Sequence, residues 1–200
     1  VETVEETGMT YCFAENYCYF PAMIEMKKLY HENKIGEFEY GEGEYIHNCV
    51  PVWPGITQGD PNHWRNNMYS TFYCTHSIGP IIHATGLRPV KVIGIESTKN
   101  ERLLAVGCKS AAFGITMITL ENGAIVKTIN GGLYENSVWY SMYGSKGAME
   151  SGRSLPKKGG TDIIYIKADK NAGDYADLPI EEYMPKGEFD TAAFDYGHGS

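Results

Sequence analysis

The feature that most constrains the fold of this 200-residue chain is a series of Val- and Ile-rich segments after residue 87. Glycines or Asn-Gly pairs separate the segments, and ENGA at 121–124 is a strong hairpin signal. We predict four or five strands with no helices between them, which read RPVKVIGIES, FGITMITLENG, AIVKTINGG, SVWYSMYGSKGAMES and TDIIYIKA. Because consecutive strands without crossover helices pair antiparallel, this pattern predicts an antiparallel meander.

The part of the chain before the meander supplies helices and one further strand. VETVEETG is acidic and helical, and the mostly apolar residues 9–19 are predicted as a strand. FPAMIEMKKLYHENKIGEF has apolar residues at helical spacing, and EFEYGEGEYIHN then alternates as a strand does. The apolar run around His76 predicts another helix, which ends at Gly86 and is kinked or restarted at Pro80.

The order of these elements defines a fold class. We predict an α+β fold, with one largely antiparallel, open-faced sheet and helices on one face. The opening helix and strand are typical of the last unit of a Rossmann domain whose earlier strands are absent. The chain begins without a Met and stops at DYGHGS without a final element, so we expect both ends to be truncated. A lost signal peptide is compatible with such a start.

Charge and composition narrow the classes of partner. The net charge of −8 argues against nucleic acid and against an anionic membrane, because both need a basic face. No apolar run approaches the roughly 20 residues that span a bilayer. Five cysteines without a CxxC pair predict reduced thiols and a cytoplasmic protein. Six scattered histidines lack the spacing of a metal site, so we predict no metal.

A long irregular segment precedes the helix of His76. Residues 49–70 carry three prolines, two glycines and two tryptophans without a clear period. Loops of this length within a compact domain are usually binding elements or disordered, and the two tryptophans argue against disorder. The sequence therefore predicts a binding loop here.

Five features, in their order along the chain, resemble the C-terminal domain of the Gfo/Idh/MocA oxidoreductases. They are a helix ending K-I-G-E at 34–37, Trp-Arg at 64–65, Thr-His at 75–76, Gly86 followed by R-P-V-K-V, and L-E-N-G-A at 120–124. The later Y-G-S-K-G-A-M-E at 143–150 resembles the glycine-rich strand turn of that family. In the family this domain holds a sugar-like substrate and is paired with an N-terminal Rossmann domain.

Two departures from the family pattern bear on the chemistry. The family has an Asp four residues before the histidine, and Phe72 stands there in this chain. The glycine-rich approach is replaced by NNMYSTFYC. The resemblance therefore does not imply a simple Asp–His proton relay for this chain. The run T-H-S-I-G-P is similar to members that act as NAD-dependent glycosidases, which oxidise a sugar transiently, eliminate the aglycone and reduce the product.

The resemblance implies a division of the chain and a cofactor. Residues 1–16 are expected to be the remnant of a dinucleotide-binding domain, and residues 17–200 the C-terminal substrate-binding α/β domain. The full-length protein is expected to be an NAD(P)-dependent oxidoreductase, whose NAD or NADP is bound mainly by the missing domain. The fragment alone is expected to be inactive.

His76 is the candidate catalytic residue. A lone histidine on an apolar helix is more often a core or capping residue than a catalyst, and spacing alone favours that alternative. The resemblance at Thr75 and His76 favours an acid/base role instead. Imidazole suits removal of a hydroxyl proton as hydride leaves the same carbon, because its ordinary pKa of about 6.5 permits proton exchange near neutral pH.

Four residues are candidates for binding the substrate. Trp64 and Arg65 are either anchors of the loop or a platform for a sugar, whose C–H groups meet an aromatic face while a guanidinium binds hydroxyls. Tyr45 and His47 are predicted to line the cleft from the alternating strand. The chain has fifteen tyrosines, so any one of them can fall near a cleft by chance, and the pattern favours no single tyrosine as a ligand-binding residue.

Asn16 and Tyr17 are the candidates for contacting the cofactor. They lie near the carboxyl end of the predicted strand 9–19, where ligands of open α/β sheets bind. We therefore expect them to face the nicotinamide side of the crevice.

Three functions remain open. The first is the substrate domain of a nicotinamide-dependent oxidoreductase acting on a sugar or sugar derivative. The second is an NAD-dependent glycoside hydrolase on the same scaffold. The third is a carbohydrate-binding or oligomerisation module without activity of its own. A homo-oligomer through the open sheet face is expected in the family, because the strands FGITMITL and AIVKTI would otherwise expose an apolar face.

Overall fold

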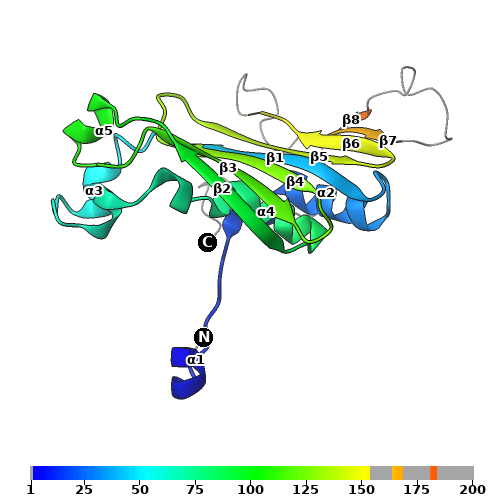
Figure 1. Cartoon of the computed structure of the whole chain (residues 1–200), viewed down its shortest axis with the longest axis horizontal. Helices are drawn as coiled ribbons and strands as arrows, with labels where there is room; N and C mark the ends of the chain where they lie inside the picture. The colour runs from blue at the N-terminus through cyan, green and yellow to red at the C-terminus, as the bar shows by residue number, and fades with distance from the viewer. Residues whose placement is uncertain (1, 154–163, 169–180, 184–200) are drawn as a thin grey trace.

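The computed structural model describes residues 2–153, 164–168 and 181–183. The helices are α1 (Glu2–Thr7), α2 (Pro21–His31), α3 (Trp53–Thr57), α4 (Thr75–Thr85) and α5 (Glu101–Ala105), with 3₁₀ turns η1 (Asn16–Tyr19), η2 (Trp64–Asn67) and η3 (Ser70–Phe72). The strands are β1 (Phe38–Ile46), β2 (Pro89–Glu96), β3 (Phe113–Leu120), β4 (Ile125–Gly131), β5 (Ser137–Gly144), β6 (Gly147–Ser151), β7 (Ile164–Ala168) and β8 (Glu181–Tyr183). The sheet forms one layer, and α2 and α4 form a second layer beneath it (Figure 1).

The sheet confirms the predicted fold class. The eight strands among the described residues lie in the order β2-β3-β4-β1-β5-β6-β7-β8, and each adjacent pair except β1 with β4 is antiparallel. The meander is therefore interrupted by the early strand β1, which lies between β4 and β5. The segment SVWYSMYGSKGAMES forms two strands, β5 and β6, because Ser145 and Lys146 turn the chain between them.

The predicted hairpin at ENGA is also confirmed. Strands β3 and β4 pair antiparallel on either side of it, with Thr119 opposite Ile125. The side-chain amide of Asn122 donates to the main-chain carbonyl of Phe38 at 2.9 Å. This bond ties the tip of the hairpin to the start of β1.

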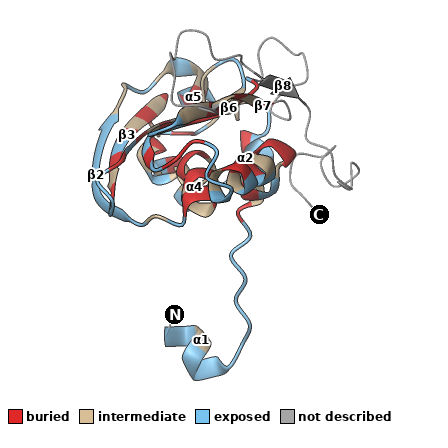
Figure 2. Cartoon of the chain, turned by 90° about the vertical axis from the view of Figure 1, so that its right-hand side faces the viewer, coloured by how far each residue is buried: buried red, intermediate tan, exposed pale blue. Residues whose placement is uncertain are grey.

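The core lies between the sheet and the two longer helices. Pro21 occupies the first turn of α2, as predicted, and the apolar stripe of this helix buries Met23, Met26 and Leu29. Figure 2 shows the buried residues of both helices facing the sheet. Each fully buried side chain of this size stabilises the fold by roughly 1.5–3 kcal/mol relative to an exposed one.

Helix α4 packs directly on β1. A Cβ atom at Gly43 would clash with the main-chain carbonyl of Ser77, so only glycine permits this approach. The side chain of Ser77 is fully buried and donates to Oδ1 of Asn130 on β4 at 2.6 Å. Both contacts fix the turn of α4 that carries His76 against the middle of the sheet.

Pro80 does not break α4, which is one helix from Thr75 to Thr85 and ends at Gly86. A proline lacks the N–H that would bond the carbonyl four residues earlier, here that of His76. The hydroxyl of Tyr140 on β5 donates to that carbonyl at 2.5 Å. The expected restart is thus wrong, whereas the kink stays a prediction. A side chain from the sheet bonds the carbonyl that the proline leaves without its helix partner.

The expected strand over residues 9–19 is wrong. Helix α1 forms and ends at Gly8 as predicted, but the chain then runs without regular structure into the 3₁₀ turn η1. Met9, Tyr11 and Phe13 are each at least 65% exposed, and among the described residues no strand lies beside them. A strand needs a neighbour to satisfy its backbone groups, so the apolar pattern alone does not form one here.

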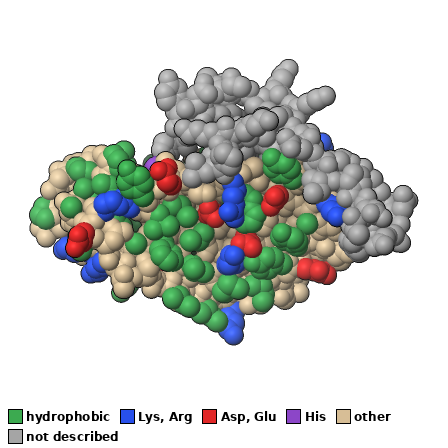
Figure 3. Space-filling view, turned by 90° about the horizontal axis from the view of Figure 1, so that it is seen from above, with side chains coloured by type: hydrophobic (Ala, Val, Ile, Leu, Met, Phe, Trp, Pro, Cys, Tyr) green, Lys and Arg blue, Asp and Glu red, His purple; other side chains and the backbone are tan. Residues whose placement is uncertain are grey.

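The face of the sheet away from the helices is open. Strand β2 is exposed along most of its length, and Ile95 is 71% exposed. Figure 3 shows apolar side chains across this face with basic and acidic groups among them. Two ion pairs lie on it, between Lys127 and Glu42 and between Arg153 and Glu44. In the part of the chain that the structure describes, no helix has the length and apolar character needed to cross a membrane.

Candidate active site

The imidazole of His76 is held between a carboxylate and a phenol. Its Nδ1 lies 2.5 Å from Oε1 of Glu15, and its Nε2 lies 3.1 Å from the hydroxyl of Tyr73. The side chain of His76 is 13% exposed and that of Glu15 is 7% exposed. His76 is therefore neither a free surface residue nor an apolar core residue, but the middle of a buried hydrogen-bond chain.

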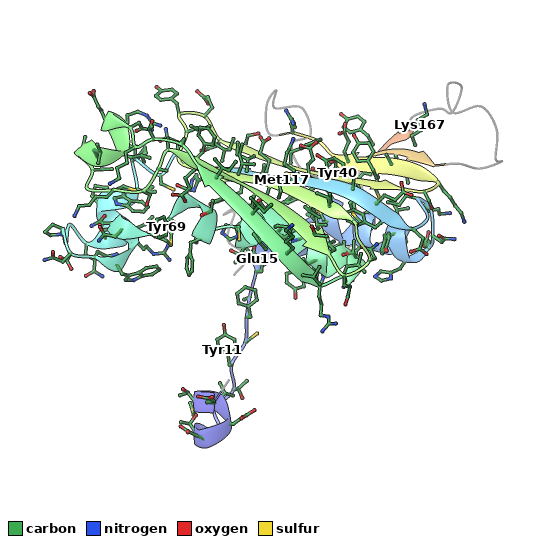
Figure 4. All side chains as sticks on the ribbon, viewed as in Figure 1. Tyr11, Glu15, Tyr40, Tyr69, Met117 and Lys167 are labelled. Atoms are coloured by element: carbon green, nitrogen blue, oxygen red, sulfur yellow. The ribbon has the colours of Figure 1, made fainter. Side chains whose placement is uncertain are left out.

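Local backbone structure positions each residue of this hydrogen-bond chain. Glu15 is the N-cap of η1, where its carboxylate accepts the main-chain N–H of Tyr17 at 3.2 Å. A Cβ at Gly79 would lie 3.1 Å from Cγ of Glu15, so a small residue on α4 lets the carboxylate approach the helix. Tyr73 lies one turn before His76, just ahead of the first residue of α4. Figure 4 shows Glu15 on the helix side of the sheet, opposite Tyr40 and Met117 on the open face.

The surroundings of Glu15 favour its ionised form. Burial by itself raises the pKa of this carboxyl, but the hydrogen bond and charge attraction from His76 and the N–H of Tyr17 outweigh burial, so the pKa is lowered. An ionised carboxylate can only accept, and therefore Nδ1 of His76 carries a proton and donates to it. In a neutral imidazole this leaves Nε2 as the acceptor that faces Tyr73.

Three tyrosine rings surround the imidazole. The ring centres of Tyr17, Tyr45 and Tyr73 lie 4.5, 4.6 and 5.2 Å from that of His76. Burial raises the pKa of Tyr17 to about 12, and burial together with neighbouring phenols raises the pKa of Tyr45 as well. These phenols stay protonated near neutral pH, so they can donate and accept hydrogen bonds without adding negative charge.

A cavity of about 120 Å³ opens beside this cluster, where the ends of β1 and β4 meet the loop 49–70 and the segment around α5. Its wall is largely aromatic and apolar, with Tyr45, Tyr69, Tyr73, Trp53, Ile56, Met68 and Leu103. His76 itself is not part of the wall, whereas Tyr45 and Tyr73, which contact His76, are. A molecule in the cavity thus meets the phenol of Tyr73 before it meets the imidazole.

The structure brings three of the four predicted substrate residues to the cavity. Tyr45, His47 and Arg65 line it, while Trp64 lies outside its wall and is 60% exposed. Nδ1 of His47 lies 3.1 Å from the hydroxyl of Tyr45. The predicted binding loop is therefore near the site, although it contains short helices that the sequence analysis did not anticipate. The roles of all four residues remain predictions.

The two residues predicted to contact a cofactor lie in η1. Tyr17 contacts both His76 and Tyr45, with ring centres 4.5 and 5.3 Å apart respectively. Asn16 is half-buried at the start of η1 and does not line the cavity. Their place at the carboxyl end of a strand is not observed, since the strand is absent. Cofactor contact by either residue remains a prediction.

Sequence reasoning missed Glu15, Tyr73 and Tyr140. Glu15 is the only charged residue between positions 8 and 20, and that isolation was a usable signal. Tyr73 precedes His76 by three residues, which is one helical turn. Nothing in the sequence points to Tyr140, because only the fold brings β5 against the turn of α4 that carries His76. The structure also shows which residue stands in for the family's Asp, whose place Phe72 takes in this chain. Phe72 is 72% exposed, and Glu15 supplies the carboxylate that contacts His76.

The donors near the site do not form a metal centre. Within residues 2–153, 164–168 and 181–183, no group of three or more His, Cys, Asp or Glu side chains could hold an ion. The five cysteines are free thiols, and Cys49 lies in the cavity wall with its Sγ 3.5 Å from Nδ1 of His47. Burial raises the pKa of Cys49, which disfavours the reactive thiolate.

Comparison with known proteins identifies the fold. No family model matches the chain, and no curated protein matches it in sequence. Solved structures do match. The aldose-aldose oxidoreductase from Caulobacter crescentus complexed with glycerol is 17% identical, with a TM-score of 0.67, over 94% of this chain and 52% of that chain.

Two further structures were solved with a nicotinamide cofactor. An inositol dehydrogenase homolog from Azotobacter vinelandii, complexed with NADH and myo-inositol, is 10% identical, with a TM-score of 0.65, over 94% of this chain and 46% of that chain. Levoglucosan dehydrogenase, in complex with NADH and levoglucosan, is 19% identical, with a TM-score of 0.66, over 100% of this chain and 52% of that chain. The chain thus spans about half the length of the solved structures it matches, and it has the α+β fold found in that half of these oxidoreductases.

Proposed function

We propose that this chain is the substrate domain of a nicotinamide-dependent oxidoreductase of the Gfo/Idh/MocA type that acts on a sugar or sugar derivative. The observation that carries the proposal is the chain Glu15–His76–Tyr73, which ends at a cavity wall. Such a chain can move a proton to and from a bound hydroxyl group. Solved structures of the same fold with inositol and levoglucosan support a sugar-like substrate.

In the proposed mechanism, the substrate hydroxyl donates to the phenol oxygen of Tyr73. As the carbon bearing that hydroxyl loses hydride, the hydroxyl proton passes to Tyr73, and Tyr73 passes its own proton to Nε2 of His76. His76 then carries protons on both nitrogens. The carboxylate of Glu15, 2.5 Å from Nδ1, stabilises this imidazolium and fixes the ring. Reduction uses the same groups in reverse.

In this proposal, Tyr17 and Asn16 contact the cofactor. The ring of Tyr17 lies beside His76, and a partly buried aromatic face can contact a flat nicotinamide ring. NAD or NADP, when bound, would accept the hydride. We propose that residues 1–16 belong to the dinucleotide-binding domain and residues 17–200 to the substrate domain, so that this chain by itself has no turnover. With its free thiols, it is proposed to be cytoplasmic.

The test of this proposal is oxidation of sugars by the full-length protein. Incubation with NAD or NADP and a panel of aldoses, inositols and anhydrosugars is expected to give NADH or NADPH in equal amount to oxidised sugar. Absence of reduced cofactor with every sugar, while a nitrophenyl glycoside is cleaved, would reject the dehydrogenase and favour the glycosidase.

A second candidate is an NAD-dependent glycoside hydrolase, and His47 favours it. Transient oxidation followed by elimination needs a second base, besides the one that deprotonates the oxidised hydroxyl. His47 is a second imidazole in the cavity wall, joined to the phenol of Tyr45 at 3.1 Å. Release of nitrophenol without net NADH supports this candidate, whereas stoichiometric NADH supports the dehydrogenase.

We further propose that the open face of the sheet forms a homo-oligomer. Met117, Ile125 and Tyr143 are each at least 40% exposed on neighbouring parts of this face, and its charges near them are already paired, as for Lys127 with Glu42. An apolar surface with neutralised charge is suited to a second copy of itself. The alternative of a binding or oligomerisation module without activity predicts the same interface but no turnover in the full-length protein.

A further inference from the structure

The balance of acidic and basic residues in the cavity wall differs from that of the whole sequence. The sequence has 25 acidic residues against 17 Lys and Arg, yet the described residues that line the cavity include no Asp or Glu. Arg65 is the one Lys or Arg among them. A neutral ligand does not require such an imbalance, whereas an anionic ligand would be repelled by carboxylates and attracted by the guanidinium.

Arg65 also differs from the other three arginines of the chain. Arg88 donates to Glu121 through Nε and Nη2 at 3.0 and 2.9 Å. Arg102 donates to Asn48 and to the carbonyl of Gly132, and Arg153 pairs with Glu44 at 3.7 Å. By contrast, the guanidinium of Arg65 has no hydrogen bond or ion pair to an oxygen among the described residues. Among the described residues, Arg65 is therefore the arginine whose guanidinium has no oxygen partner, and it lines the cavity.

Two aromatic rings hold the guanidinium of Arg65. Its central carbon lies 4.7 Å from the ring centre of Trp64 and 5.8 Å from that of Tyr73. Contacts of this kind use the faces of the guanidinium plane and leave the N–H groups at its edge available. The ring of Trp64 is in turn stacked on His63 at 5.8 Å. The stack reduces the freedom of the side chain without using its hydrogen bonds.

The same geometry ties Arg65 to the proposed reaction site. Tyr73, which contacts the guanidinium, is also the residue whose hydroxyl lies 3.1 Å from Nε2 of His76. A ligand that reaches both groups would have an anionic group close to its reacting hydroxyl. A single guanidinium fork matches one carboxylate in a bidentate pair, and the lining residues that the structure describes include no lysine to match a second charge.

We propose that Arg65 recognises an anionic group of the substrate, and that the substrate class is a sugar acid whose carboxylate pairs with its guanidinium. The inference rests on the proposed function in placing a sugar in this cavity. A phosphate on a sugar shares the required chemistry and is the other source of the anion. Trp64, outside the wall, acts as a positioning residue for the guanidinium.

The experiment is calorimetric titration of the full-length protein with matched probes. D-Glucuronate and D-galacturonate are compared with D-glucose and D-galactose, and D-glucose 6-phosphate forms a third arm. We expect the wild-type protein to bind at least one sugar acid roughly tenfold or more tightly than its neutral counterpart, with affinity falling as salt is raised. A preference for the phosphate that depends on Arg65 supports the anion site and identifies phosphate as its source.

The variants are Arg65→Gln and Arg65→Lys, with Arg88→Gln as the matched control. Arg88 is 82% exposed and pairs with Glu121 at the hairpin. We expect Arg65→Gln to remove the preference for the charged probe and leave neutral-sugar affinity unchanged, Arg65→Lys to weaken it partially, and the control to bind as wild type. Equal binding of charged and neutral probes by the wild-type protein, no binding of any charged probe, or equal losses for both probes in Arg65→Gln would overturn the inference.

Two readouts separate this inference from the proposed function. Calorimetry needs no turnover, so a sugar acid that binds through Arg65 without any NADH formation rejects the oxidoreductase and retains the anion site. Conversely, oxidation of neutral sugars by a wild-type protein that binds charged and neutral probes equally retains the oxidoreductase and rejects the anion site. If Arg65→Gln fails to fold, the wild-type preference and Arg65→Lys still decide the outcome.

Discussion

The hydroxyl of Tyr140 donates to the main-chain carbonyl of His76 at 2.5 Å, in the place of the helix bond that Pro80 cannot make. Tyr140 is 1% exposed, and burial raises the pKa of its phenol well above the usual value, so the hydroxyl keeps its proton. The sheet thereby fixes the backbone of the candidate catalytic residue. At this position of α4, a hydrogen bond from Tyr140 on the sheet takes the place of the main-chain hydrogen bond that Pro80 cannot form.

The first prediction concerns this replacement. Tyr140→Phe leaves the carbonyl of His76 buried without a partner, and we expect it to lower the free energy of unfolding by about 1–3 kcal/mol. Urea denaturation measures the change. Pro80→Ala is expected to supply an N–H that can bond the same carbonyl, so Tyr140→Phe should cost less in the Pro80→Ala background. An equal cost in both backgrounds would show that the two groups do not share the carbonyl.

A second prediction tests the contact between α4 and β1. Gly43→Ala places a Cβ against the main-chain carbonyl of Ser77, which cannot move without shifting the helix. We expect a loss of unfolding free energy of roughly 1–3 kcal/mol, as for other overpacked sites. Gly55→Ala in α3 is the control, because nothing lies within 4 Å of a Cβ there. Equal stability of the two variants would contradict the proposed close packing.

Stability should depend on pH through Glu15. The pKa of Glu15 in the folded chain is lowered from its ordinary value of 4.5, so the ionised carboxylate stabilises the fold above about pH 4.5, and this contribution is lost as pH falls through the lowered pKa. Glu15→Gln should therefore destabilise the protein at pH 6 and much less at about pH 3. Urea melts at both pH values provide the comparison. A difference in unfolding free energy between wild type and variant that stays constant with pH would count against stabilisation by the ionised carboxylate.

The open face gives a fourth prediction. Met117→Glu adds an unpaired charge in the middle of the exposed apolar surface and is expected to reduce the oligomer to smaller species. Light scattering of the full-length protein measures the molar mass. Ile24→Glu is the control, since Ile24 is similarly exposed, at 38%, but lies on helix α2 on the other side of the sheet. A wild-type protein that is already monomeric would remove the basis for this interface.

Elements with strong local patterns could be predicted from the sequence, and those that need distant partners could not. The hairpin at ENGA, helix α2 and the end of α4 at Gly86 depend on turn chemistry or a single apolar stripe, and each is confirmed. The insertion of β1 between β4 and β5 depends on pairings between residues about 85 to 106 positions apart, which no local pattern encodes. The prediction of a strand at residues 9–19 was wrong for the same reason, because an apolar pattern does not reveal whether a neighbouring strand exists.

The candidate site divides in a similar way. His76 is a candidate because the family resemblance at Thr75 and His76 outweighed its spacing, which alone favoured a core residue, and its catalytic role stays a prediction. Of the residues predicted to bind substrate, Tyr45, His47 and Arg65 do line the cavity. The carboxylate partner could not be assigned, since Glu15 lies 61 residues from His76 in the chain. The family spacing pointed to position 72 for the carboxylate partner of His76. In the fold this carboxylate comes instead from Glu15, the N-cap of η1.

The most direct measurement is the kcat of the full-length enzyme carrying His76→Gln, with His83→Gln as a control from the same helix. His83 bonds Lys27 at 3.0 Å and lies outside the cavity wall, so its variant should turn over as wild type. We expect His76→Gln to lower kcat by roughly 100-fold or more, the usual loss for a general base, with substrate affinity largely retained. A near-normal kcat in His76→Gln would contradict the account and leave the Glu15–His76–Tyr73 chain as a purely structural feature.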